Sequence, residues 1–322
     1  MNYKKHFISL LLTIVVFAFF TQLSAQTNRY HFLDSTIYRV LQVNPSVTNS
    51  AITNWDTAHV VYYNPSISNN KVLLWLTGTT GTTNNIPEGY FKTALEQGYR
   101  IIALSFISVP AVSRICRGGI LNNNSDCAAD FRRRRIYGDN DFSMIPDQPQ
   151  DAIIPRLVKL LQYLITTDPN GSWQQYLDKG MSQPQWIKIA ISGQSQGGGM
   201  GQFIAQYENI DRVISFSGGW DYSNSADRKI ADWYFRESVT PLEKWYATYN
   251  INENVANSIK EICIALNIPP DNVFALDKQL RDINLSGLSN PYHGDGLKNP
   301  AYKEVWLEML GSGLLNLCPP KL

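Results

Sequence analysis

A serine stands among small residues at the end of an apolar run. Residues 186–193 read WIKIAISG and lead into QSQGGGM, so that Gly193, Ser195 and Gly197 fit the pattern G-x-S-x-G. This pattern is typical of a nucleophilic serine on a tight turn between a strand and a helix, where bulky neighbours would not fit. The first amides of that helix would face a developing negative charge. The sequence therefore predicts Ser195 as a nucleophile.

A glycine-rich helix start can also bind phosphate. Here the segment lacks the lysine of a P-loop and the G-x-G-x-x-G spacing of a dinucleotide site, so this alternative is weaker. Serine is a poor nucleophile until a neighbouring base accepts its proton. A nucleophilic Ser195 would therefore need a histidine and an acid.

Only one histidine follows the serine along the chain. His6, His31 and His59 precede it, whereas His293 lies in the loop NPYHGDG before the last predicted helix. On an elbow of this kind the chain order is serine, acid, histidine. His293 is therefore the predicted base, although a lone loop histidine is more often an ordinary surface residue.

The acid is left open by the sequence. Asp221 follows the apolar run RVISFSG, and Glu253 follows the next run, KWYATYN. Residue type favours Asp221, because aspartate is the commoner acid in such triads. Position favours Glu253, which follows the second strand after the nucleophile. We prefer Asp221, with Glu253 as the alternative and Asp277 or Asp282 behind both.

An oxyanion hole needs two backbone N–H groups. One is expected from Gln196, directly after the serine, and the other from the loop after the early strand VLLWL. That loop reads TGTTGTT over residues 77–83. Thr79 is the predicted donor and Thr80 its neighbour, unless the loop is an ordinary polar turn.

Strands and helices alternate along the chain. Because the predicted strands are near-continuous apolar runs, they indicate a mostly parallel sheet with helices on both faces. The predicted strands cover residues 59–68, 71–78, 99–106, 186–193, 212–218, 244–250 and 272–276. The predicted helices cover residues 87–98, 152–166, 198–208, 254–266 and 300–310. We expect one domain over residues 26–322, with an irregular insertion at about 107–150.

The first residues predict export. Lys4 and Lys5 precede an apolar stretch that ends at Leu23-Ser24-Ala25, which is typical of a signal peptide cut after Ala25. A retained anchor is the alternative, but the apolar stretch is short for a membrane span. Removing two lysines and no acid leaves 26 basic residues (28 − 2) against 27 acidic ones. This balance argues against a nucleic-acid partner.

Four cysteines lie after the predicted cleavage site. In an oxidising compartment an even number suggests two disulfides. Cys116 and Cys127 bracket the polar loop RGGILNNNSD and are expected to pair, which leaves Cys263 with Cys318 by elimination. Zinc binding is the alternative, but no cysteine has a suitably spaced Cys or His neighbour. No metal or organic cofactor is implied.

Together the elbow, the LTGTTGT loop and the late YHGDG resemble the α/β-hydrolase superfamily. More narrowly, the chain is similar to secreted bacterial hydrolases that share a PGTGGT-like loop, a cysteine-bracketed insertion followed by arginine and YG, and a GHSQGG elbow. The resemblance covers most of residues 59–311. This chain departs from it at Gln194, where histidine is more usual, and at Thr77, where proline is common.

The resemblance implies a secreted serine hydrolase that cleaves a carboxylic ester, small or polymeric, through an acyl-Ser195 intermediate. A peptidase or an acyltransferase would use the same triad, and an extracellular binding protein could keep the fold without the activity. The run FRRRR in the insertion either binds a substrate carboxylate through Arg132–Arg135 or pairs with nearby acids.

Overall fold

The structure is a computed structural model that describes residues 30–223, 228–278 and 290–311. The predicted signal segment and Cys318 lie outside these residues. Contacts divide the chain at Tyr38, and in the first unit the Asp34 carboxylate accepts hydrogen bonds from the amide and hydroxyl of Thr36. All helices and strands described below belong to the second unit, which begins at Arg39.

Eight strands of the described chain form one sheet in the order β1-β2-β4-β3-β5-β6-β7-β8. β2 pairs antiparallel with β1 and β4, and all other neighbours are parallel. The predicted mostly parallel sheet is therefore confirmed. The strands are β1 (Arg39–Val43), β2 (His59–Tyr63), β3 (Val72–Leu76), β4 (Arg100–Ala103), β5 (Ile189–Gln194), β6 (Arg212–Phe216), β7 (Trp245–Asn250) and β8 (Val273–Leu276).

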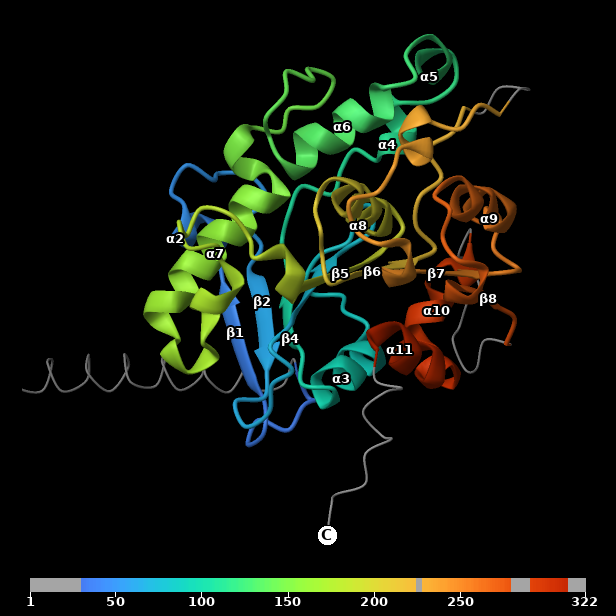
Figure 1. The fold of residues 1–322 in the computed structure, drawn as a ribbon. Helices are drawn as coiled ribbons and strands as arrows, with labels where there is room; N and C mark the ends of the chain where they lie inside the picture. The colour runs from blue at the N-terminus through green and yellow to red at the C-terminus, as the bar shows by residue number, and fades with distance from the viewer. Residues whose placement is uncertain (1–29, 224–227, 279–289, 312–322) are drawn as a thin grey trace, which may run out of the picture. The chain divides into compact units, whose positions relative to one another are not determined.

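Helices cover both faces of the sheet (Figure 1). Successive strand side chains point to opposite faces. On one face Ile191 and Val213 contact α8 (Gln196–Tyr207), and the same core cluster includes residues of α7 (Ile153–Thr167) and α9 (Ala256–Ala265). The core therefore holds the segment after β5 rigidly against the sheet.

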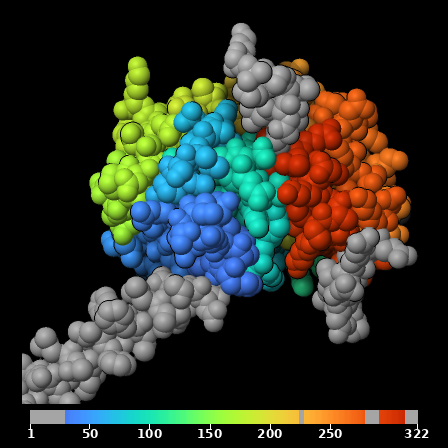
Figure 2. Space-filling view, turned by 90° about the horizontal axis from the view of Figure 1, so that it is seen from below, coloured from blue at the N-terminus to red at the C-terminus, as the bar shows by residue number. Residues whose placement is uncertain are grey.

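The other face carries α3 (Glu88–Glu96) and α11 (Lys303–Leu310), which lie side by side (Figure 2). Tyr90 of α3 packs edge-on against Phe216 of β6 and Trp306 of α11, with ring centroids 5.0 and 6.0 Å apart. Helix α10 (Asp295–Lys298), which contacts α3, follows the loop that carries His293. Aromatic packing thus anchors α11, the helix that follows the segment carrying this histidine.

The insertion at 107–150 is partly helical, which corrects the expectation of an irregular segment. It contains α4 (Val112–Ile115), α5 (Gly119–Asn123) and α6 (Cys127–Ile136), and the predicted Cys116–Cys127 disulfide is present. The buried face of α6 could not be predicted from the hydrophobic pattern, because two of its buried residues, Arg132 and Arg135, are charged. A further short helix, α2 (Pro45–Thr48), and β1 were also not predicted.

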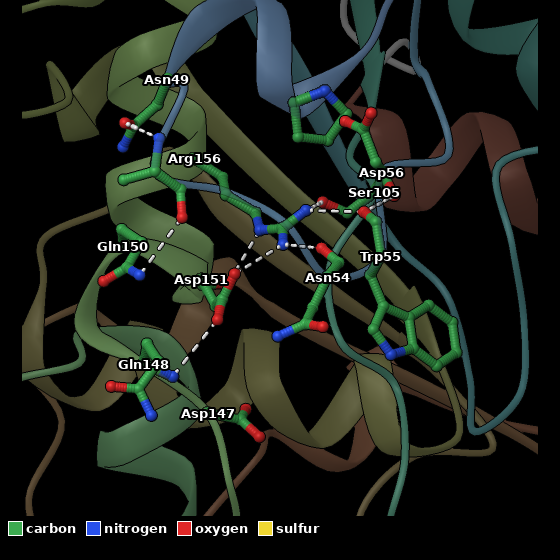
Figure 3. Close-up of polar contacts among 12 residues, drawn as sticks. Asn49, Asn54, Trp55, Asp56, Ser105, Asp147, Gln148, Gln150, Asp151 and Arg156 are labelled. Carbon is green, nitrogen blue, oxygen red and sulfur yellow. Dashed lines mark hydrogen bonds and ion pairs between the residues drawn. The ribbon is translucent and has the colours of Figure 1, made fainter.

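A buried arginine joins three segments near the insertion (Figure 3). Arg156 of α7 donates from Nη1 to the carbonyls of Trp55 and Ser105, from Nη2 to the carbonyl of Asn54, and pairs with Asp151 at 3.1 Å. Each of these carbonyls belongs to irregular backbone that has no strand partner there. Arg156 therefore supplies the hydrogen bonds that a sheet would otherwise give.

His59, at the start of β2, is buried beside this arginine. Its Nδ1 accepts a hydrogen bond from the amide of Ser105 at 2.9 Å, so the imidazole is neutral. Burial, assisted by the positive charge of Arg156, lowers the pKa of His59 from its usual 6.5 to about 3. Between these two pKa values the unfolded chain binds a proton that the folded chain does not.

We predict that His59 makes the protein less stable as the pH falls from 6.5 toward 3. Its contribution is complete above pH 6.5, and moving from pH 7 to pH 5 should cost about 2 kcal/mol. His59→Asn keeps an acceptor for the Ser105 amide but does not titrate in this range. Urea unfolding at pH 7 and pH 5 should therefore show a smaller loss of stability in the variant. Equal losses in the two proteins would contradict the assignment.

Candidate active site

Ser195 occupies a strained turn between β5 and α8. Its backbone has φ 56° and ψ −122°, which a residue with a side chain rarely adopts. The turn is tight because the backbone passes close to its neighbours. A Cβ on Gly197 would lie 2.1 Å from the carbonyl oxygen of Leu76, and one on Gly193 would lie 2.4 Å from the carbonyl carbon of Gly197. Glycine is therefore required on both sides of the serine.

The predicted base, His293, is paired with an acid. Its Nδ1 lies 2.8 Å from Oε2 of Glu253, whose side chain is fully buried, whereas the His293 side chain is 22% exposed. This acid was the alternative to Asp221 in the sequence prediction. A carboxylate at Nδ1 favours the tautomer with its proton on Nδ1, which leaves Nε2 as the free proton acceptor.

Two further groups orient Glu253. Its Oε1 accepts from the hydroxyl of Ser217 at 2.7 Å and from the amide of Asn250 at 2.9 Å. Asn250 is the last residue of β7, and its side-chain amide donates to Asp295 at 3.0 Å. The carboxylate is thus fixed from β6, through Ser217, and from β7. Ser217 and Asn250 carry no signal in the sequence beyond their places at the ends of apolar runs.

Asp221 follows β6 but is engaged elsewhere. Its two oxygens accept from Nε and Nη2 of Arg132 at 2.7 and 2.8 Å, and Oδ2 also accepts from Nε1 of Trp233 at 3.0 Å. The preferred prediction for the acid therefore differs from the pairing in the structure. Asp277 is exposed, and Asp282 lies outside the described residues.

The glutamines on either side of Ser195 hold two loops at the elbow. Gln194 donates from Nε2 to the backbone carbonyl of His293 at 3.1 Å. Gln196 donates to the carbonyl of Ser108 at 2.7 Å and accepts from the amide of Val112 at 2.9 Å. The x positions of the G-x-S-x-G pattern therefore connect the serine to the histidine loop and to the insertion, a role that the sequence analysis missed.

Thr79 and Gln196, two of the predicted oxyanion-hole residues, line the same cleft as Ser195. The loop turns at this point, since the amide of Gly81 donates to the carbonyl of Gly78 at 2.9 Å. Thr80 is at the exposed tip of the turn with a positive φ of 63°, and its hydroxyl donates to the carbonyl of Thr79. Thr79 is therefore better placed than Thr80 to meet a bound substrate.

A narrow cleft lies beside Ser195. Trp220 forms part of its wall and packs edge-on against the His293 ring, with centroids 5.3 Å apart. The remaining wall comes from two parts of the chain. The insertion contributes Ala111, Val112, Ser113 and, from α6, Arg132, and the segment after β6 contributes Gly219 and Asp221. The insertion thus contributes directly to the cleft.

Charge in the cleft is balanced by one buried pair. Burial opposes the positive charge of Arg132, but Asp221 outweighs this and raises the guanidinium pKa above its ordinary value. Among the described residues, no group of three or more His, Cys, Asp or Glu side chains could hold a metal ion. The described part of the chain also has no helix long and apolar enough to span a membrane.

A serine elbow at the carboxyl end of a central parallel strand, with helices on both faces of the sheet, decides the architecture. The chain has the α/β-hydrolase fold. This confirms the fold class that the sequence predicted.

Comparisons with known proteins found matches among solved structures. No protein-family model and no curated protein matches the chain. Similar solved structures include an α/β-hydrolase enzyme, MGS-M1, from a Medee basin deep-sea metagenome library, with 13% identity over 85% of this chain and 98% of that one and a TM-score of 0.41. A dienelactone hydrolase from Anabaena variabilis is 13% identical over 84% and 97%, with a TM-score of 0.45. Esterase B from Lactobacillus rhamnosis is 13% identical over 94% of both chains, with a TM-score of 0.46.

We predict that Gln196 keeps the insertion against the elbow. Gln196→Leu leaves the amide of Val112 and the carbonyl of Ser108 without their partner, which should destabilise the protein by about 1–3 kcal/mol. Hydrogen exchange should then quicken at the Val112 amide. Gln194→Leu is the matched control, because it removes a bond to the His293 loop instead. If Gln196→Leu leaves exchange at Val112 unchanged, the tether is not a stabilising contact.

Proposed function

We propose that the chain is a serine hydrolase that cleaves a carboxylic ester through an acyl-Ser195 intermediate. The observation that carries this proposal is the 2.8 Å pair between His293 and Glu253, on a loop hydrogen-bonded to the residue before a strained serine. Buried acid, imidazole and serine on an elbow are the parts that acyl transfer to water requires. The fold alone would not imply an activity.

In the first half-reaction, His293 Nε2 accepts the proton of the Ser195 hydroxyl while Oγ attacks the ester carbonyl carbon. Glu253 stabilises the imidazolium that forms and holds its tautomer. The tetrahedral intermediate then collapses, the carbon–oxygen bond to the alcohol breaks, and His293 gives its proton to the leaving alcohol. Water repeats these steps on the acyl-enzyme and releases the acid, which restores the Ser195 hydroxyl.

The oxyanion of that intermediate would be bound by backbone amides. We assign one to Gln196, at the first position of α8, where the partial positive charge of a helix start adds to the hydrogen bond. The second is assigned to Thr79, whose loop borders the cleft. Glycine at position 78 supports this, because a Cβ there would come within 3.2 Å of the Ser195 Cβ.

An exported location fits this activity. A disulfide closes the loop between Cys116 and Cys127, and disulfides persist in oxidising compartments. With the signal-like residues before Ala25, this supports action on an ester outside the cytoplasm, in the periplasm or the medium. The second proposed pair would need Cys318, which the structure does not describe. Cys263 is a buried thiol, and burial raises its pKa to about 12.

We predict that a fluorophosphonate labels Ser195 in the purified protein. Peptide mass mapping should place the adduct on this residue, and His293→Ala should abolish labelling because the hydroxyl loses its base. Ser195→Ala should fold normally and lose hydrolysis of short esters by a factor on the order of 10⁴ or more. Full activity in Ser195→Ala would contradict the assignment of Ser195 as the nucleophile.

The two acids should differ in what their loss affects. Glu253→Gln removes the charge beside His293 and should lower kcat by roughly 10³–10⁴, with a folded protein. Asp221→Asn should instead lower stability, by about 3–5 kcal/mol, because Arg132 keeps a buried charge without its partner. Measuring kcat per folded molecule together with urea unfolding separates these effects. A larger loss of kcat in Asp221→Asn than in Glu253→Gln would reverse the assignment.

A further inference from the structure

Arg132 is the one arginine of the run FRRRR that lines the cleft of Ser195. Its neighbours have other partners: Arg133 pairs with Asp139 on the surface, Arg134 donates to backbone carbonyls, and Arg135 forms a buried pair with Asp147. The Arg132 side chain is only 2% exposed and therefore lies in the interior. Burying a charged side chain is costly, so its position there calls for a structural or functional reason.

The pairing of Arg132 is incomplete. Nε and Nη2 donate to Asp221, and the Tyr234 hydroxyl also lies within interaction range of the guanidinium, but among the described residues Nη1 is buried and makes no hydrogen bond. Buried donors in native proteins are nearly always satisfied by protein, water or ligand, because an unpaired one costs stability. An arginine that keeps one donor unused on the wall of a catalytic cleft is therefore suited to a group that arrives with the substrate.

The position of the guanidinium relative to Ser195 follows from α8. A Cβ on Gly199 would lie 2.7 Å from Nη2 and 2.9 Å from Nη1 of Arg132, so the guanidinium rests on this glycine. The Gly199 amide donates to the carbonyl of Ser195 at 3.1 Å, which places the two residues about 6 Å apart along the helix. Oxygens three or four bonds from the scissile carbonyl carbon are the candidates for this contact.

The charge of Arg132 is already matched. Asp221 binds it through two hydrogen bonds, and Trp233 lies 5.1 Å from the guanidinium carbon. A substrate carboxylate would gain the Nη1 hydrogen bond but would be repelled by the Asp221 carboxylate, which lines the same cleft. An uncharged oxygen gains the hydrogen bond without that repulsion.

We propose that Arg132 determines substrate specificity by donating from Nη1 to an uncharged oxygen, a hydroxyl or carbonyl, on the acyl group of the ester. This rests on the proposed esterase function and adds a substrate class to it: short esters of hydroxy or oxo acids. Replacing that oxygen by a methyl group leaves the buried donor without a partner in the complex. Such sites discriminate strongly against the analogue that lacks the polar group.

The test compares pairs of p-nitrophenyl esters that differ by one oxygen. One pair is 3-hydroxybutanoate and 3-methylbutanoate, and the second is 4-oxopentanoate and 4-methylpentanoate. Rates of alkaline hydrolysis correct each ester for its intrinsic reactivity. The wild type should prefer the oxygen-bearing member of at least one pair by roughly ten- to hundred-fold in kcat/KM, the range expected for a hydrogen bond to a charged donor.

Arg132→Lys keeps a cation beside Asp221 but lacks the second fork of the guanidinium, so it should reduce this preference to near unity. Arg133→Lys is the matched control, since Arg133 is an exposed neighbour paired with Asp139, and it should keep the wild-type preference. The Arg132→Lys effect is read from the ratio of two esters in one protein preparation. A loss of folded protein therefore does not imitate it.

Three results would overturn the inference. The first is an equal kcat/KM for both members of both pairs in the wild type, and the second is an unchanged preference in Arg132→Lys. The third comes from a fifth ester, the negatively charged p-nitrophenyl half-ester of succinate: a preference for it over all four neutral esters. The last result would mean a carboxylate subsite. Failure of the proposed function looks different, because then no ester is hydrolysed and fluorophosphonate does not label Ser195.

Discussion

The close approach of the elbow to strand β3 constrains the whole site. Gly197 lies so near the carbonyl of Leu76 that no side chain fits, and Ser195 adopts a positive φ of 56°. Such strain persists only when the surrounding structure over-determines it. Here the amide of Ser195 donates to the carbonyl of Phe216 on β6, and the helix behind it packs on Ile191 and Val213. The sheet core thus supports a conformation that the turn alone would not keep.

Side chains then connect irregular segments to this rigid centre. Gln194 holds the histidine loop, and Gln196 holds the start of the insertion. Two buried arginines extend the same arrangement outward: Arg135 donates to the carbonyls of Val109 and Pro110, and Arg156 to those of residues 54, 55 and 105. The carbonyl groups of loops that have no strand partner thereby accept hydrogen bonds. The buried guanidinium charges must in turn be paired with carboxylates, and Asp147 and Asp151 are these partners.

Sequence patterns predicted the fold well where burial is carried by apolar residues. Strands β2, β3 and β4 are fully buried and read as apolar runs, and the stripe of α7 is equally plain. The patterns failed where the buried residues are charged or polar. Helix α6 buries Arg132 and Arg135, which a periodicity argument counts as exposed, and edge strand β1 has a mixed burial pattern. Ser195, His293 and the Thr79 loop could be selected as candidates because their residue types and order carry the signal.

Which carboxylate pairs with His293 could not be predicted in this way, because the pairing depends on which carboxylate already has a permanent cation as its partner. Asp221 and Glu253 follow adjacent strands and are equally plausible in sequence. Asp221 is bound by both forks of Arg132, so its charge is neutralised before any reaction begins. Glu253 Oε1 accepts only from neutral partners in the described chain, the hydroxyl of Ser217 and the amide of Asn250, and Oε2 is turned to His293. In the proposed mechanism, a carboxylate whose other partners are neutral keeps its full electrostatic effect for the imidazolium that would form beside it. Such a charge stabilises the transition state more than the ground state, which is the condition for catalysis.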